Sequence, residues 1–387
     1  MPIAYKEVKD TKYLYFFYYD NDKKKKTETY CGLASDPTAI EKAEKLESEQ
    51  LQKQIIILQR QLKELNNRSA KRLNEQQTIL INQKIQTPNT TPFSIPKTNH
   101  TIYIADSREM TEIEDNSIHL VVCSPPYFNA PHDYKNLFKN YEDFLSLMKD
   151  LASQMARKLQ DGRIACINCD DMLVDGEKWP IVADIIGIFR ENGFRYRDQI
   201  IWRKPDGYIR ASRRSGVLIQ HPYPMYFYPD NVSESILIFQ KNRNFDYQSV
   251  KPELNEMSKI DVNEYLDEKW YMNMWTMTNV LPLNRIEKGI AAFPDELPYR
   301  LIKLFSFVGE TVLDPVLGSG TTSKVAKELG RNSIGYEKDG SLIPIIQKKI
   351  ASRLKLKNPK LLEQEPTTEI SYDLQIKTRK PTVLVSQ

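Results

Sequence analysis

Four consecutive residues, Ser124, Pro125, Pro126 and Tyr127, combine groups that could hold a flat ring bearing an amino group. They follow a short apolar run, residues 118–122, which predicts a buried strand. Two consecutive prolines cannot continue a sheet ladder, because they lack an N–H and their φ is fixed. The chain therefore leaves the strand in a stiff loop, where a hydroxyl and a carbonyl could accept hydrogen bonds from an exocyclic amine while the tyrosine ring stacks on its plane. A rigid turn without a ligand would use the same residues.

A glycine-rich segment, residues 315–322 (PVLGSGTT), is the second stretch that could do chemistry. A strand-like run ending in Asp314 precedes it, a helix-like run (323–329) follows, and a second strand-like run ends before Glu337. In this order the glycines let the backbone approach a ligand at a helix N-terminus, and the acid can bind ribose hydroxyls. The turn is not GxGxxG and no Gly-Lys-Ser/Thr follows it, so it predicts neither a dinucleotide nor a P-loop phosphate. A tight turn without a ligand stays open here as well.

Together these stretches resemble one family, the S-adenosylmethionine-dependent DNA amino-methyltransferases. SPPY resembles their catalytic motif, and DPVLGSGTT (314–322) resembles their cofactor loop, usually written DPFxGSGTT. FPDELPYRLI (293–302) resembles the helix beside the cofactor methionine, and IYIADS (102–107) resembles the strand whose acid lies near the adenine. The catalytic motif precedes the cofactor motif, as in the permuted beta group, and the resemblance covers about residues 100–350. One departure is Val316, where the family usually has an aromatic wall of Phe.

The resemblance implies an α/β fold with a Rossmann-like sheet, S-adenosyl-L-methionine as cofactor, double-stranded DNA as partner and no metal. A target base would be flipped out of the duplex and stacked on Tyr127. Glu337 would take the cofactor ribose and Asp106 would lie beside its adenine. The catalytic residues implied are Ser124, Pro125, Pro126 and Tyr127. The cofactor-binding residues implied are Asp106, Asp314, Pro315, Gly318, Ser319, Gly320, Thr321, Thr322 and Glu337.

The first residue of the catalytic motif bears on the target base. Serine resembles the cytosine-N4 enzymes of the family and aspartate the adenine-N6 enzymes, so Ser124 predicts cytosine N4, with adenine N6 as the alternative. A chain of another class, a non-catalytic DNA-binding subunit, is the second alternative, although the complete motifs argue against it. Cys123 precedes the motif without the Pro-Cys pair that the carbon-5 cytosine enzymes use, and we interpret it as core.

The length, charge, cysteine content and apolar runs of the chain limit which classes of protein it can belong to. A chain of 387 residues is long enough for two or three domains, and a formal charge of +4 does not by itself imply nucleic acid. Cys166 and Cys169 form a CxxC inside a strand-like run, with no second pair and no nearby His, so we interpret them as core. No apolar run approaches the length of a membrane span and no signal pattern opens the chain, which predicts a cytoplasmic protein without a membrane partner.

The N-terminal third shows no catalytic pattern. Residues 1–36 alternate and are rich in Tyr and Phe, which predicts a β-hairpin. Residues 37–87 are polar and helical, with a leucine seam from Leu51 to Leu65. This helical arm could form a homodimer, a helical hairpin, or an amphipathic helix lying on its own catalytic domain. Residues 88–99 are rich in Pro and Thr and read as a linker.

The remaining boundaries follow from the resemblance. Residues 100–205 would form the catalytic half of the methyltransferase domain and residues 283–357 its cofactor-binding half. Residues 206–282 would form an inserted target-recognition region with its own strand at 235–241. Residues 358–387 would be a tail that docks or is partly disordered. A cognate restriction endonuclease is a further partner that such a protein could have.

A basic segment at residues 203–214 (RKPDGYIRASRR) carries five basic side chains against one acid. A loop of this composition can follow a phosphate backbone, although a solvated basic loop would look the same. It begins where the family inserts its target-recognition region, and Trp270 and Trp275 would form the core of that small region. The predicted DNA contacts are therefore Arg203, Lys204, Arg210, Arg213 and Arg214.

Overall fold

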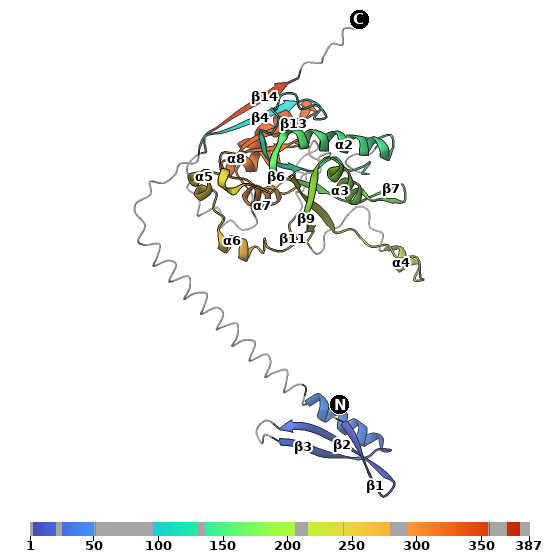
Figure 1. Ribbon diagram of the computed structural model, residues 1–387. Coiled ribbons are helices and arrows are strands. Elements are labelled where there is room, and N and C mark those ends of the chain that lie inside the picture. Colours follow the sequence, from blue (N-terminus) through green and yellow to red (C-terminus); the bar gives the residue numbers. More distant parts are fainter. Residues whose placement is uncertain are drawn as a thin grey trace, which may run out of the picture. The chain divides into compact units, whose positions relative to one another are not determined.

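The computed structural model describes residues 3–20, 25–49, 51, 96–130, 136–205, 216–242, 244–278, 293–354, 356 and 370–379. The chain divides into two units, Met1–Pro92 and Phe93–Gln387 (Figure 1). None of the described helices combines the length and the apolar character that a membrane crossing needs.

The first unit is a small antiparallel sheet backed by a helix. Strands β2 (Thr11–Asp20) and β3 (Lys25–Leu33) form the expected hairpin, and β1 (Ile3–Val8) adds a third strand to it. The helix that begins at residue 37 packs its alanines on one face of this sheet, against Leu14 and Phe16. A hairpin alone is marginally stable, and this helix supplies the buried face that it needs. Beyond Leu51 the predicted leucine seam lies outside the described residues.

The second unit is built on one nine-stranded sheet with the order β11-β9-β10-β6-β5-β12-β13-β4-β14. All neighbouring strands are parallel except β10, which runs antiparallel to both β9 and β6. The strands are β4 (Thr98–Ile104), β5 (Ile118–Cys123), β6 (Leu159–Cys169), β9 (Phe194–Arg203), β10 (Ser233–Lys241), β11 (Met274–Thr276), β12 (Thr311–Asp314), β13 (Asn332–Glu337) and β14 (Tyr372–Thr378). The mixed α/β sheet of Rossmann type is therefore as expected.

Helices cover both faces of this sheet (Figure 1). Helices α2 (Tyr141–Lys158) and α3 (Ile181–Glu191) bury their apolar stripes in one core, with Phe144 and Phe189 fully enclosed. Helices α7 (Glu296–Phe305) and α8 (Thr321–Glu328) enclose the opposite core. Helix α9 (Ile343–Ala351) packs with Ile102 of β4. Asn140 caps α2 by accepting the Asp143 N–H (2.8 Å), and acids in the first turn and bases in the last turn of α2 suit the helix dipole.

The expected target-recognition region, residues 206–282, is wrong in one respect. The strand expected inside it is part of β10, which lies in the middle of the catalytic sheet between β9 and β6. Residues 234–241 of this strand are all buried, as expected for a strand inside a sheet that is covered on both faces. β10 thereby divides the expected region into residues 206–232, before it, and residues 242–282, after it.

The two tryptophans expected in a separate small core belong to the core that packs against the main sheet. Trp275 lies on β11, which pairs in parallel with β9, and Trp270 packs edge-on against Tyr299 of α7. The second half of the insertion contains the 3-10 turn η1 (Tyr247–Ser249) and helices α5 (Pro252–Met257) and α6 (Val262–Asp267). This second half of the insertion therefore adds the strand β11 to the sheet and also contributes helices beside it.

Smaller elements complete the unit. The strands β7 (Met172–Val174) and β8 (Glu177–Trp179) form a separate ribbon, α4 (Gly216–Gln220) lies between β9 and β10, and η3 (Gly340–Leu342) precedes α9. The C-terminal segment docks through β14, which pairs with β4 along its whole length. Just beyond β14, the Arg379 guanidinium donates to the Glu112 carboxylate (2.7 Å), which fastens this edge.

Candidate active site

The loops that follow β4, β5 and β12 and the end of β13 meet at one edge of the sheet, because these strands are adjacent and parallel. A cavity of about 480 Å³ lies at this edge and joins the catalytic motif to the glycine-rich loop. Eight of the predicted residues line it: Asp106, Ser124, Pro126, Pro315, Gly318, Ser319, Thr321 and Glu337. Five more, all described, lie outside its lining: Pro125, Tyr127, Asp314, Gly320 and Thr322.

The glycine-rich loop is held in shape by buried contacts. The Asp314 carboxylate accepts the Thr322 hydroxyl (2.6 Å) and the Val316 N–H (3.1 Å), so these residues fold the loop from below the cavity. Gly318 (φ 54°) and Gly320 (φ 90°) adopt left-handed backbone conformations that favour glycine. Burial raises the pKa of Asp314 to about 7.

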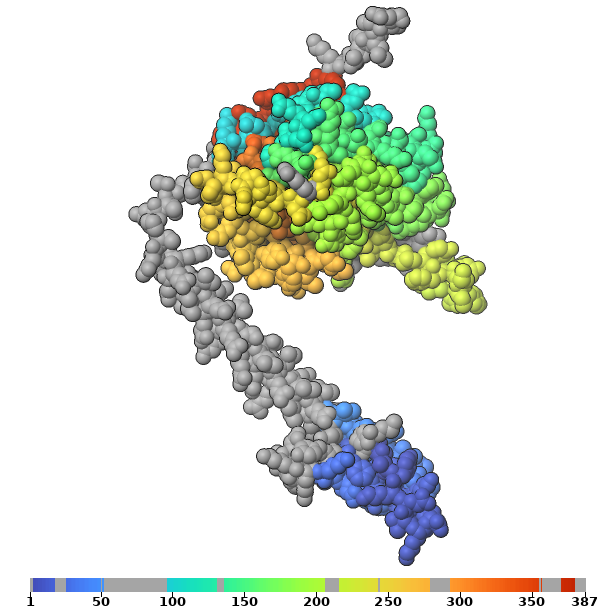
Figure 2. Space-filling model, in the orientation of Figure 1, coloured from blue at the N-terminus to red at the C-terminus, as the bar shows by residue number. Residues whose placement is uncertain are grey.

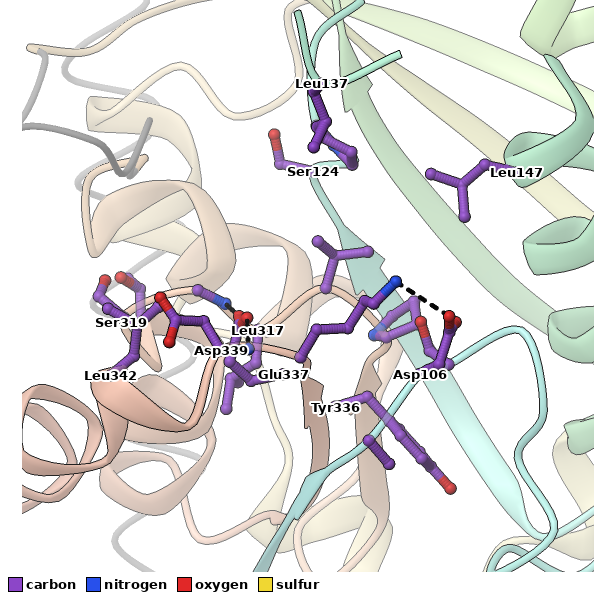
Figure 3. Close-up of a pocket in the computed structure, with 18 of the residues that line it drawn as sticks. Asp106, Ser124, Leu137, Leu147, Leu317, Ser319, Tyr336, Glu337, Asp339 and Leu342 are labelled. Carbon is purple, nitrogen blue, oxygen red and sulfur yellow. Dashed lines mark hydrogen bonds and ion pairs between the residues drawn. The ribbon is translucent and has the colours of Figure 1, made fainter. Parts of the chain in front are cut away.

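Glu337 joins this loop to the end of β13. One carboxylate oxygen accepts the Gly318 N–H (2.8 Å) and the other accepts the Asp339 N–H (2.9 Å) (Figure 3). Burial raises the pKa of Glu337, although these backbone donors partly oppose the shift. Each oxygen keeps a further lone pair for a hydroxyl group in the cavity. The position therefore suits the ribose contact that the sequence predicts.

Asp106 stands across the cavity from the glycine-rich loop and is surrounded by cations. Arg108 donates to both of its carboxylate oxygens, and the Lys338 ammonium lies 3.0 Å from one of them (Figure 3). Partial burial opposes ionisation, but the hydrogen bonds from Arg108 and Lys338 outweigh it and lower the pKa of Asp106. The carboxylate therefore remains an acceptor throughout the physiological pH range.

The catalytic motif divides between the cavity and a buried polar cluster. Ser124 lines the cavity, whereas Tyr127 does not, and the Tyr127 hydroxyl donates to Glu234 Oε2 (2.5 Å). Asn168 Nδ2 donates to the same oxygen (2.8 Å) and lies 3.4 Å from Ser124 Oγ. Lys204 Nζ pairs with the other oxygen, Glu234 Oε1 (2.6 Å). We call these five residues the Glu234 cluster.

This geometry corrects one predicted DNA contact. The Lys204 side chain is fully buried and pairs with Glu234, so its charge does not reach a phosphate at the surface. Arg203 is exposed at the end of β9, whereas Arg210, Arg213 and Arg214 lie outside the described residues. The sequence suggested the same exposure for Arg203 and Lys204, but adjacent residues of a strand face opposite sides.

Comparison with known proteins decides the family. The profile of the DNA methylase family matches residues 118–348. The type II methyltransferase M.MjaI of Methanocaldococcus jannaschii is 38% identical over 291 residues, which cover 67% of this chain and 93% of the relative. The chain belongs to the S-adenosylmethionine-dependent DNA amino-methyltransferases. The type II methyltransferase M.MthZI of Methanothermobacter thermautotrophicus is also similar, at 32% identity over 68% of this chain and 79% of its own.

A solved structure extends the similarity to three dimensions. TTHA0409 of Thermus thermophilus, described as a DNA modification methylase and solved with S-adenosyl-L-methionine, is 26% identical to this methyltransferase with a TM-score of 0.55. The similarity covers 73% of this chain and 99% of that chain. The motif order, with the catalytic strand β5 before the cofactor strand β12, is the permuted order that the sequence predicts.

The cavity of this methyltransferase fits S-adenosylmethionine in size and chemistry. Its volume lies in the usual range for small-molecule sites, roughly 300–1,000 Å³. Two acceptors in its lining, Asp106 and Glu337, suit an adenine amine and ribose hydroxyls, and Leu317 supplies an apolar wall. Val316 also lines the cavity, without the aromatic ring that the family usually has there, while Phe293 and Tyr336 contribute rings elsewhere in the lining.

Sequence reasoning missed several residues of the methyltransferase site. Asn168, Glu234 and Lys338 all contact predicted site residues, yet none belongs to a motif. Glu234 lies 107 positions from Tyr127, and only the pairing of β10 with β6 brings them together. The sole local signal for this contact was that Glu234, an acid, lies just before the apolar run of β10. Among the described residues, no group of His, Cys, Asp or Glu could hold a metal ion.

Proposed function

We propose that this methyltransferase moves a methyl group from S-adenosylmethionine to the exocyclic N4 of cytosine in a specific duplex DNA sequence. The observation that carries the choice of cytosine is Ser124, a neutral hydroxyl at the first motif position and on the wall of the cofactor cavity. Serine at this position resembles the cytosine-N4 enzymes of the family. Aspartate, typical of the adenine-N6 enzymes, is absent from this position.

When bound, S-adenosylmethionine supplies an activated methyl group on a sulfonium. A duplex hides the exocyclic nitrogen, so the base must be flipped out to reach the site. The Ser124 hydroxyl and the Pro125 carbonyl then accept the two amine hydrogens, while the Tyr127 ring stacks on the base. This would hold the nitrogen lone pair in line for the new N–C bond, which forms as the methyl–sulfur bond breaks and leaves a neutral thioether, so the step is a positioning problem. The nitrogen regains neutrality by releasing one proton to water, without a covalent intermediate on the protein.

The DNA would lie along the chain between β9 and β10. Arg203 is exposed at the end of β9, and the basic segment continues from it. Residues 216–232, here called the protruding segment, then expose Ile219 (81%), Met225 (91%) and Phe227 (69%). Figure 2 shows this yellow-green segment standing out from the catalytic unit. Apolar side chains presented in this way insert between base steps in several DNA-binding proteins, which supports a contact beside the flipped base.

Identifying the base that receives the methyl group is the decisive test. The protein is incubated with mixed-sequence duplex DNA and methyl-labelled S-adenosylmethionine, the DNA is digested, and the nucleosides are separated by mass-resolved chromatography. Label in N4-methylcytosine is expected. Label in N6-methyladenine would refute the choice of cytosine and keep the family reaction. Methylation left unchanged by Ser124→Ala and by Tyr127→Ala would contradict the mechanism.

Two partners are part of the proposal. The relatives M.MjaI and M.MthZI are named type II methyltransferases, which supports a cognate restriction endonuclease for this chain. The leucine seam supports a homodimer through the helical arm, residues 37–87. Sedimentation of the full chain should give twice the monomer mass, and a monomer at micromolar concentration would contradict the dimer.

A further inference from the structure

The Glu234 cluster contains a buried ion pair, Lys204–Glu234, whose carboxylate lies on the side of the catalytic motif. Glu234 Oε1 pairs with Lys204 Nζ (2.6 Å), and Glu234 Oε2 accepts from Tyr127 and Asn168. The Lys204 ammonium also lies 2.9 Å from the centre of the Trp202 ring. The pair is therefore neutral overall, with its negative end toward Ser124 and Tyr127.

Ionisation of Glu234 fixes the neighbouring groups. Burial opposes ionisation, but the Lys204 charge and the hydrogen bonds to the carboxylate outweigh it and lower the pKa of Glu234. An ionised carboxylate can only accept hydrogen bonds, so the Asn168 carboxamide must turn its Nδ2 toward Glu234. The Tyr127 hydroxyl must likewise point its proton at this carboxylate, which sets the plane of the ring. The ion pair thus preorganises two groups beside the catalytic loop.

The other end of the Asn168 carboxamide has an unused acceptor. Asn168 is 3% exposed, and its Oδ1 is buried without a hydrogen-bond partner among the described residues. Leaving such an oxygen unpaired costs about 1–3 kcal/mol, so native proteins rarely keep one without a reason. The Nδ2 end of this carboxamide lies 3.4 Å from Ser124 Oγ, beside the place where the target amine would be held, and Oδ1 is bonded to the same carbon as Nδ2. A donor from the substrate would satisfy this oxygen.

We propose that Asn168 Oδ1 accepts a hydrogen bond from the exocyclic amine of the flipped base, and that the Lys204–Glu234 pair is the device that positions it. The amine is planar while its lone pair is conjugated with the ring. Because Ser124 and Pro125 accept the two amine hydrogens, Asn168 Oδ1 shares the hydrogen held by Ser124 in a bifurcated bond, draws it out of that plane and so frees the lone pair. The nitrogen becomes positive as it receives the methyl group, and the negative end of the ion pair faces it at that moment.

Two variants separate this role from folding. Asn168→Ala removes the acceptor together with the Nδ2 donor to Glu234 and keeps the Lys204–Glu234 ion pair. The double variant Lys204→Met with Glu234→Gln removes the directed ion pair without leaving a buried charge uncompensated. Each should lower kcat by about 10²- to 10³-fold, the range seen when one preorganised group is lost. The KM for S-adenosylmethionine should stay within about threefold, because Asn168 and Glu234 do not line the cofactor cavity.

The matched control is the buried ion pair of Arg163 and Glu310, which lies at the opposite ends of β6 and β12 from the site. The double variant Arg163→Met with Glu310→Gln removes a similar buried pair from the same sheet. It should change the melting temperature without changing kcat. Equal losses of kcat in the control and the Glu234 variants would show a structural role only and overturn the proposal.

A second readout does not depend on turnover. DNA carrying 2-aminopurine at the target position fluoresces when the base leaves the stack. Asn168→Ala should keep at least half of the wild-type fluorescence rise, because the contact with the amine acts after flipping. A wild-type kcat in both Glu234-cluster variants would refute the inference. It rests on amino-methyl transfer to DNA rather than on the identity of the base, so label in adenine would refute the cytosine proposal alone.

Discussion

A single methyl group added at Gly335 should weaken cofactor binding from outside the cavity. Gly335 lies on β13 behind Leu317, which lines the cavity. A Cβ at Gly335 would stand 2.8 Å from both Leu317 methyl carbons and 3.1 Å from Leu317 Cγ, whereas ordinary contacts begin at 3.4 Å. The methyl carbons must therefore retreat by about 0.6 Å (3.4 − 2.8). The Leu317 backbone is held by its N–H bond to the Tyr336 carbonyl (2.8 Å), so the side chain moves and enters the cavity.

Overpacking of this kind costs about 1–3 kcal/mol. If the cost falls on the bound state, the Kd for S-adenosylmethionine in the Gly335→Ala variant rises roughly 5- to 150-fold, at 1.4 kcal/mol for each factor of ten. If it falls on the free protein, the melting temperature drops by about 2–4 °C for each kcal/mol. Isothermal titration calorimetry and a thermal melt together account for both cases. Wild-type affinity and wild-type melting temperature in the same variant would refute the reasoning.

Two controls make the test specific. Gly187→Ala lies within α3, where a new Cβ meets no atom within 4 Å, so it should leave affinity unchanged and stabilise the helix by about 0.5–1 kcal/mol. In a Leu317→Ala background the clash has no partner, and Gly335→Ala should then change the Kd by less than about twofold. A full loss of affinity in that background would show that Leu317 does not transmit the effect.

Three further outcomes are expected. Because burial raises the pKa of Asp314 from 3.8 to about 7, the folded chain keeps a proton that the unfolded chain releases, and stability falls as pH rises from about 4 to about 7. Asp314→Asn can keep both hydrogen bonds, so its melting temperature should exceed that of the wild type above pH 7; coincident pH profiles would contradict this. Arg379→Ala should weaken S-adenosylmethionine binding by roughly fivefold in a calorimetric titration. The reason is that Arg379 holds the Glu112 carboxylate, which accepts a hydrogen bond from the hydroxyl of Tyr336 in the cavity wall. Unchanged affinity would show that this edge of the sheet does not support the site. Phe227→Ser should raise the KM for duplex DNA by roughly tenfold without altering cofactor affinity, and an unaltered KM would exclude a DNA contact by this exposed ring.

The two loops of the site could be predicted from sequence because their chemistry is local. Two prolines after an apolar run end a strand whatever surrounds them, and glycines in left-handed conformations fold a turn from a few residues. Parallel strands bring their carboxyl ends to one edge, so Ser124, Gly318 and Glu337 could be expected near one cavity, and the structure lines it with all three.

Lys204 and β10 show where local reasoning ends. A lysine in a basic run reads as exposed, but its burial was decided by Glu234, a residue 30 positions later on another strand. The apolar run of β10 was recognisable as a buried strand, yet any buried sheet would accept it. Its place in the sheet is fixed only by its pairing with both β6 and β9. This pairing puts β10 in the catalytic sheet and not in a separate target-recognition region.

The sequence by itself determined the family, the two motif loops and their order along the chain, because these depend on backbone geometry within a few residues. Tertiary structure alone decided that Tyr127 turns its hydroxyl to Glu234, that Asn168 is left with a buried acceptor, and that Asp314 supports the loop from below the cavity. These contacts join positions 8 to 107 residues apart in sequence. The bond between Asp314 and Thr322 stays within one loop, but the bond between Tyr127 and Glu234 forms only after strand pairing has brought the two side chains together, so no local pattern encodes it.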